Sequence, residues 1–215
     1  MPQPYELTVS QTSRQIKDKK LSPVDLARSL LERIDATDKD LKAWVTIDRE
    51  EVLTTARQRE EEAHQGKTRG LLHGVPVGLK DIFYTAGMKT AAGSKVYADF
   101  VPEFDATSVV KIKEAGGIIL GKAVTTEFAT SDPSPTYNPW NFEHTPGGSS
   151  SGSSVAVATK TVAAALGSQT GGSTCRPAAY NGIVGLKATY GRISRYGVVP
   201  VSWSLDHVGI LVRTV

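Results

Sequence analysis

Residues 107–120 read TSVVKIKEAGGIIL. Val109 and Ile112 are spaced as on one face of a helix, and Gly116-Gly117 ends that helix. The apolar run 118–120 follows at once and predicts a buried strand. A helix that leads directly into a buried strand, in a glycine-rich part of the chain, predicts an α/β fold in which helices cover a mixed β-sheet.

The chain upstream of this stretch predicts surface helices. Residues 1–70 hold 13 basic and 13 acidic residues, more than half of all the charges. Ser22-Pro23 is typical of a helix start, because serine caps the first turn and proline fits the first helical position. A second helix is expected over 48–65, and its charge run 57–62 is interpreted as a solvated face. We therefore expect residues 1–70 to form a helical segment that packs on a core formed by residues 71–215.

The composition narrows the class of protein. With 22% charged residues, a net charge of +3 and no block of basic residues, the chain suits a soluble domain that binds no nucleic acid. No secretory signal opens the chain and no apolar run is long enough for a membrane span, so we expect a cytoplasmic protein without a membrane partner. The single Cys175 excludes an internal disulfide framework. The histidines show no metal-ligand spacing, so no metal or cofactor is expected.

The first of three stretches that carry chemistry is GVPVGLKD, residues 74–81. Lys80 stands at the end of an apolar strand, where burial disfavours the charged form and lowers the pKa of an amine. The plainer alternative is a lysine that emerges from the strand end and pairs with Asp81, and this stretch alone favours it.

The second stretch is TPGGSSSGS, residues 145–153. Its composition is typical of a flexible linker. However, the apolar run VAVA at 155–158 follows directly, so a linker here would interrupt a core. A hydroxyl-rich turn at a helix start also presents unpaired backbone N–H groups.

The third stretch is GSQTGGSTCRPA, residues 167–178. A Gly-Gly-Ser turn after an apolar run suits a nucleophile, Ser173, on a tight loop. Glycines let the backbone aim several N–H groups at one point, as an oxyanion hole requires. The alternative is a glycine-rich turn with an incidental serine. Cys175 beside Ser173 raises the question of a cysteine nucleophile, but the sequence supplies no base for it.

Taken together, the three stretches resemble the amidase-signature family of amide hydrolases. Lys80 in PVGLKD matches the family's lysine motif, and GGSS at 147–150 and TGGS at 170–173 match its two serine motifs. Ser149 and Ser173 also have the family's separation of 24 positions. The likeness runs from about Val24 to the last residue and includes GK (121–122), EFA (127–129), NPWN (138–141), RPA (176–178), GIVGLK (182–187) and SWSLDHVG (202–209).

The resemblance implies a mechanism for these residues. Ser173 would be the nucleophile that forms the acyl-enzyme, and it needs a base because a serine hydroxyl is weak at neutral pH. Ser149, which the family places after a cis peptide bond, would relay the proton to an unprotonated Lys80. Such Ser-Lys arrangements are a known variant of the catalytic triad.

The resemblance also implies how the oxyanion is bound, and the same turn carries a candidate substrate-binding residue. The backbone N–H groups of Thr170, Gly171, Gly172 and Ser173 would stabilise the tetrahedral oxyanion. We interpret Arg176 as a substrate-binding residue, because a guanidinium on the same turn pairs well with a carboxylate near the scissile amide. The alternative is a structural arginine that holds the loop through backbone carbonyls.

The third stretch departs from the family pattern at two positions. Many family members carry Asp and Arg where this chain has Gln169 and Cys175, and its arginine comes one step later. The paired change resembles a subgroup of small-molecule amidases that includes malonamidase-type enzymes. It speaks against the catalytic subunit of a tRNA-dependent amidotransferase.

The expected function is therefore hydrolysis of a small-molecule carboxylic amide to an acid and ammonia or an amine, without a cofactor. Family catalytic domains are considerably longer than 215 residues, so the resemblance implies the N-terminal half of the catalytic core. Two alternatives stay open: the A subunit of a tRNA-dependent amidotransferase, and a catalytically silent truncated fragment. The sequence leaves a homo-oligomer open as well.

Overall fold

A six-stranded mixed sheet forms the centre of the computed structural model, which describes residues 3–215. Its order is β1-β3-β2-β4-β6-β5. Strands β2, β3 and β4 run parallel to one another, whereas the β1–β3, β4–β6 and β5–β6 pairs are antiparallel. The strands are β1 (Trp44–Thr46), β2 (Pro76–Lys80), β3 (Ile118–Ala123), β4 (Ala164–Gln169), β5 (Val184–Lys187) and β6 (His207–Val212). The predicted α/β fold with a mixed sheet is confirmed.

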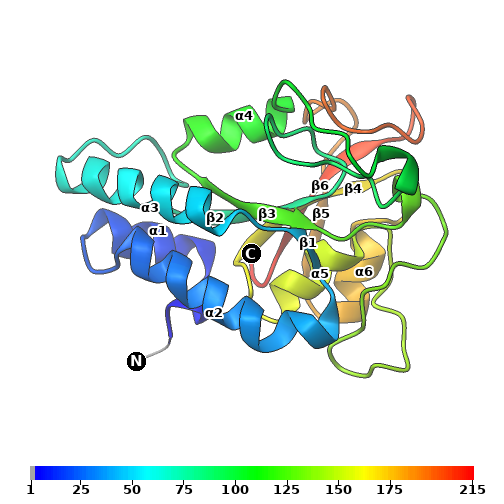
Figure 1. Cartoon of the computed structure of the whole chain (residues 1–215), viewed down its shortest axis with the longest axis horizontal. Coiled ribbons are helices and arrows are strands. Elements are labelled where there is room, and N and C mark those ends of the chain that lie inside the picture. The colour runs from blue at the N-terminus through cyan, green and yellow to red at the C-terminus, as the bar shows by residue number, and fades with distance from the viewer. Residues whose placement is uncertain (1–2) are drawn as a thin grey trace.

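Helices cover both faces of this sheet. Figure 1 shows α4 on one side, and α2, α5 and α6 on the other. Each face has its own apolar cluster, with Leu30, Leu120 and Val155 in one and Leu79, Val109 and Leu166 in the other. The helices are α1 (Val9–Lys17), α2 (Pro23–Leu41), α3 (Arg49–His64), α4 (Thr107–Glu114), α5 (Ser151–Ala158) and α6 (Cys175–Asn181), with 3₁₀ turns η1 (Pro4–Glu6), η2 (Lys95–Tyr97) and η3 (Glu127–Ala129). Within residues 3–215, no helix combines the length and the apolar character needed to cross a bilayer.

The expected helix starts in the N-terminal segment are confirmed. Ser22 Oγ accepts hydrogen bonds from the backbone amides of Val24 and Asp25 and so caps α2. Asp48 caps α3 in the same way through the Glu51 amide. The segment also contributes β1, which pairs with β3 at the edge of the sheet and was not predicted. Three residues between two helices are too few to show the alternation that identifies a strand.

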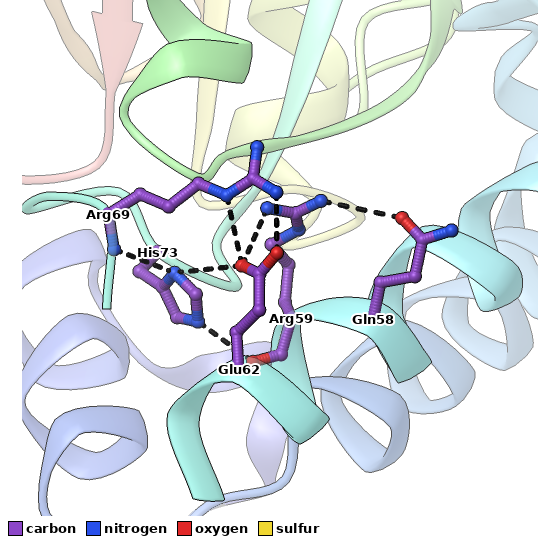
Figure 2. Close-up of polar contacts among 5 residues, drawn as sticks. All are labelled: Gln58, Arg59, Glu62, Arg69 and His73. Carbon is purple, nitrogen blue, oxygen red and sulfur yellow. Dashed lines mark hydrogen bonds and ion pairs between the residues drawn. The ribbon is translucent and has the colours of Figure 1, made fainter. Parts of the chain in front are cut away.

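The interpretation of residues 57–62 as a solvated face is wrong for Arg59. This side chain is only 6% exposed, and its Nη1 donates to Glu62 Oε2 at 2.8 Å. Arg69 donates to the same carboxylate through Nε at 3.0 Å. Figure 2 shows these side chains gathered with His73, whose Nε2 lies 2.8 Å from the carbonyl oxygen of Arg59. The reason is that the chain after α3 folds back over this side of the helix, so Glu62 is shared by two arginines.

The sheet order brings the ends of β2 and β4 together. These strands are parallel neighbours, with Leu79 opposite Leu166. Their carboxyl ends therefore meet at one edge of the sheet, where Lys80 ends β2 and Gln169 ends β4. The loop before α5 reaches the same edge, because Ser150 Oγ donates to the Ser168 carbonyl oxygen at 3.2 Å.

Candidate active site

Lys80 is the centre of the polar cluster at this edge. It is fully buried, and its Nζ lies 2.6 Å from Ser149 Oγ and 2.7 Å from Ser168 Oγ. Burial holds the pKa of the Lys80 amine well below its ordinary value, and the negative charge of Asp206 opposes this only in part. The alternative in which Lys80 pairs with Asp81 is not what the structure holds, since Asp81 Oδ2 accepts from the Ala91 amide instead.

The serine-rich stretch 145–153 is part of the core and not a linker. Ser149 is only 1% exposed, and the peptide bond between Gly148 and Ser149 is cis, as the resemblance implied. A Cβ atom added to Gly152 would overlap with the Ala43 carbonyl oxygen, so the first turn of α5 packs directly on backbone. The carbonyl oxygen of Ser149 accepts from the Thr126 amide at 3.3 Å. These contacts fix the backbone on both sides of Ser149.

Ser173 lies on the loop between β4 and α6, beside the Ser149 loop. The Ser150 amide donates to the Ser173 carbonyl oxygen at 3.2 Å and joins the two loops. The Ser173 side of the loop is partly exposed, in contrast to buried Lys80 and Ser149. The structure thus brings the three predicted catalytic residues into one region, with Lys80 and Ser149 in hydrogen-bond contact.

The loop that carries Ser173 leaves backbone donors free. In the part of the chain that the structure describes, the amides of Gly171, Gly172 and Ser173 donate to no protein acceptor. The next two amides, those of Thr174 and Cys175, both donate to Gln169 Oε1 at 2.9 Å. Gln169 therefore caps the start of α6 by accepting from the amides of Thr174 and Cys175. The free amides of residues 171–173 come directly before them, and such free donors suit an oxyanion hole.

Arg176 holds the serine loop from the side of α6. Its Nε and Nη2 donate to the Gly148 carbonyl oxygen at 3.2 and 2.7 Å. This is the loop-holding role that the sequence analysis kept as an alternative. The same side chain also lines a cavity of about 380 Å³ together with Gly148, Thr126 and Tyr180. Substrate binding by Arg176 therefore stays a prediction.

Two residues of the cluster were not predicted. Ser168 is the second hydroxyl at Lys80 Nζ, and Asp206 is the charge that acts on Lys80. Asp206 also accepts from Thr170 Oγ1 and, through Oδ2, from the amides of Val201 and Ser202 at 2.8 and 2.9 Å. Both residues lie in stretches that carried the resemblance, but only the antiparallel pairing of β4 with β6 shows that they meet.

Two further possibilities were a cysteine nucleophile at Cys175 and a metal site. Cys175 is exposed, and its Sγ lies 3.9 Å from the Gly185 carbonyl oxygen, a contact that supplies no base. Across residues 3–215, no group of three or more His, Cys, Asp or Glu side chains is arranged to hold a metal ion.

Comparison with known proteins identifies the family. Residues 25–215 match the family described as Amidase. The A subunit of glutamyl-tRNA(Gln) amidotransferase from Geobacter sp. (strain M21) is 44% identical over 98% of this chain and 44% of its own length. The peptide amidase of Stenotrophomonas maltophilia superposes with a TM-score of 0.93 at 39% identity, over 99% of this chain and 46% of that one.

A second solved structure comes from the amidotransferase branch. The A subunit of glutamyl-tRNA(Gln) amidotransferase from Thermotoga maritima superposes with a TM-score of 0.80 at 37% identity, over 97% of this chain and 44% of that one. The chain thus spans less than half the length of these relatives. The match to the family covers nearly the whole chain and includes the Lys80–Ser149–Ser173 region, so the chain belongs to the amidase family.

Proposed function

We propose that this chain carries the catalytic centre of a serine amidase that hydrolyses a carboxylic amide through an acyl-enzyme. The observation that supports this most directly is the contact of 2.6 Å between Lys80 Nζ and Ser149 Oγ inside the protein. Burial lowers the pKa of Lys80, so the amine is available in its neutral form as a proton acceptor.

In the proposed reaction Ser173 Oγ attacks the amide carbon. Its proton passes to Ser149 Oγ, and the proton of Ser149 passes to Lys80 Nζ, which becomes an ammonium. The negative charge on the former carbonyl oxygen is stabilised by the free amides of the 171–173 loop. When the C–N bond breaks, the proton returns along the same path to the leaving nitrogen, and ammonia or an amine departs. Water then attacks the ester of Ser173 with the same base and releases the acid.

The proposed substrate is a small amide with an anionic group near the scissile bond, as a malonamidase-type enzyme would take. Arg176 supports this, because it lines a cavity of about 380 Å³ beside the Gly148-Ser149 peptide. Its Nε and Nη2 are occupied by the Gly148 carbonyl oxygen, which leaves Nη1 as the donor for a substrate carboxylate. We further propose that the protein acts in the cytoplasm.

A serine-directed fluorophosphonate and a set of amides test this function. The probe should label Ser173, and Ser173→Ala should lose both labelling and turnover. Lys80→Arg should lose turnover by a factor of about 10²–10⁴, because a guanidinium stays protonated and cannot serve as the base. Labelling that survives Ser173→Ala, or an active Lys80→Arg, would contradict the mechanism. A folded chain with neither labelling nor turnover would favour a catalytically silent fragment.

The second candidate is the A subunit of a tRNA-dependent amidotransferase. It is favoured by the amidotransferase subunits that are 44% and 46% identical to this chain. Such a protein would release ammonia from glutamine in company with partner subunits. Glutamine hydrolysis that requires partner proteins would support this candidate, whereas partner-independent turnover of other amides would support the amidase.

A further inference from the structure

Two buried charged residues take no part in the proposed reaction. Lys122 is fully buried on β3, and Asp81, which follows Lys80 directly, is 1% exposed. Burial raises the pKa of the Asp81 carboxyl and lowers that of the Lys122 amine, and each charge partly offsets the cost of the other. Both belong to motifs that carried the family resemblance, LKD and GK, without a role of their own. Burying two charges is costly, so we expect Asp81 and Lys122 to have a role in the fold or in the site.

The sheet places these charges on the opposite face from the serines. Lys122 is in register with Leu79, so it shares a face with Leu79, while Lys80 points to the other face. Asp81 continues the alternation onto the face of Lys122. There Lys122 Nζ donates to the Phe83 carbonyl oxygen and, at 2.7 Å, to Thr90 Oγ1. Lys122 thus connects the two ends of the loop 83–90 that leaves β2.

Asp81 is held by backbone at the far end of the same loop. Its Oδ2 accepts from the Ala91 amide at 3.1 Å, and its carbonyl oxygen accepts from the Ala92 amide at 2.9 Å. Ala92 and Gly93 have positive φ angles of 51° and 67°. These two hydrogen bonds of Asp81 tie the backbone at 91–92 to the residue that directly follows Lys80.

The segment held by Asp81 reaches the serine side of the site. The Phe128 amide donates to the Ala92 carbonyl oxygen at 2.8 Å, and Ser94 Oγ donates to Glu127 Oε1 at 2.6 Å. The Thr126 amide, at the start of that turn, donates to the Ser149 carbonyl oxygen. Hydrogen bonds joined by the 126–128 backbone therefore link Asp81, through Ala92, to the backbone of Ser149, while Lys80 is bonded covalently to Asp81.

We propose that Asp81 and Lys122 are positioning residues. They lie on the reverse face of the sheet and keep Lys80 and Ser149 within proton-transfer distance of each other. This proposal rests on the proposed function, because the distance matters only if Ser149 relays a proton to Lys80. A displacement of about 1 Å at a reacting pair costs roughly a hundredfold in rate. Loosening the 81–93 loop should therefore act on turnover more than on substrate binding.

Three variants of the whole chain test the proposal: Asp81→Asn, Lys122→Met and the double variant. Each single change leaves one buried charge without its counterpart, so both should lower the Tm. The double variant removes both charges and should recover much of the Tm. It still lacks the bonds from Lys122 to Phe83 and Thr90, so its kcat should stay at least tenfold below wild type with KM within about twofold. The exposed pair Lys111→Met/Glu114→Gln serves as the control and should change neither quantity.

Recovery of both Tm and kcat in the double variant would mean that the two charges serve the fold alone, and would overturn the proposal. The crystal structure of the double variant gives a measurement that does not depend on turnover. The distance from Lys80 Nζ to Ser149 Oγ should lengthen beyond hydrogen-bond range, and an unchanged 2.6 Å would equally overturn the proposal. Failure of the proposed function can be told apart from failure of this positioning proposal. It would appear as activity that survives Ser173→Ala.

Discussion

The substitution Lys80→Met tests the neutral state of Lys80 without any substrate. Lys80 is fully buried, and burial is the largest cause of its lowered pKa. Methionine has similar length and an apolar side chain, so it fills much of the same space without a titrating group. The variant loses the contacts to Ser149 and Ser168 as well, but that loss does not change with pH while both serines are neutral.

The pH dependence follows from the direction of the shift. An unfolded lysine has a pKa of about 10.4. Because the folded pKa is lower, there is a pH range in which the unfolded chain binds a proton at Lys80 and the folded chain does not. Within that range the free energy of unfolding of the wild type rises with pH by about 1.4 kcal/mol per pH unit. Above the unfolded pKa and below the folded pKa, this contribution stops changing.

Lys80→Met lacks this contribution at every pH. The difference in free energy of unfolding, variant minus wild type, should therefore fall as pH rises, by about 2.7 kcal/mol over two pH units inside the window. The variant should have its greatest advantage at the low end of the window, because the unfolded lysine is most fully protonated there and wild-type folding must remove that proton. The other titrating groups are common to both proteins and cancel in the difference.

Urea unfolding of both proteins at half-unit steps from about pH 7 to about pH 9.5 measures this difference. The exposed Lys67→Met variant is the control for loss of a lysine as such. A difference that stays constant across the range would show that Lys80 keeps the same protonation in the folded and unfolded chains. That result would refute the neutral lysine and, with it, the base role of Lys80.

Two further substitutions address the substrate and the packing of the serine loop. Arg176→Gln should lower kcat/KM for anionic amides by about 10–150-fold, the scale of a lost charged hydrogen bond, with neutral amides much less affected. An equal loss for both substrate classes would mean that Arg176 acts only by holding the Gly148 carbonyl oxygen. Gly152→Ala should destabilise the protein by about 3 kcal/mol and lower the Tm by roughly 6–12 °C, because the new methyl group meets the backbone at Ala43 and Val124. Alanine is the better helix former, so an unchanged or higher Tm would show that the backbone yields easily.

Local sequence signals were sufficient for the elements that position the site. The Ser22 cap and the break at Gly116-Gly117 act within one turn of chain, so the structure starts α2 and β3 where these signals predict. Strand β1 lacked such a signal because it is three residues long and is held by its pairing with β3. Arg59 was also misassigned because its burial depends on a contact that is not local in sequence. The chain returns over α3 at His73 and covers this side chain.

Only part of the candidate site could be predicted from the sequence. Lys80 and Ser149 could be named because the three stretches together resemble one family in order and spacing. Each stretch alone left a plainer alternative open. Ser168 and Asp206 could not, because a serine before a Gly-Gly-Ser turn and an aspartate after a tryptophan-containing loop have no distinctive spacing. Their proximity to Lys80 arises from the neighbouring positions of β2, β4 and β6 in the sheet.

The sheet order also explains why this site combines the buried amine of Lys80 with the partly exposed Ser173. Lys80 belongs to a strand flanked on both sides by parallel neighbours and covered on both faces, so its amine is desolvated by the core. Ser173 lies past the end of β4, on a loop with free amides facing no protein acceptor in the described chain. The buried Ser149 bridges the two environments. A serine is well suited to this position, because its hydroxyl can both donate and accept a hydrogen bond and carries no charge that would add to the cost of burial beside Lys80.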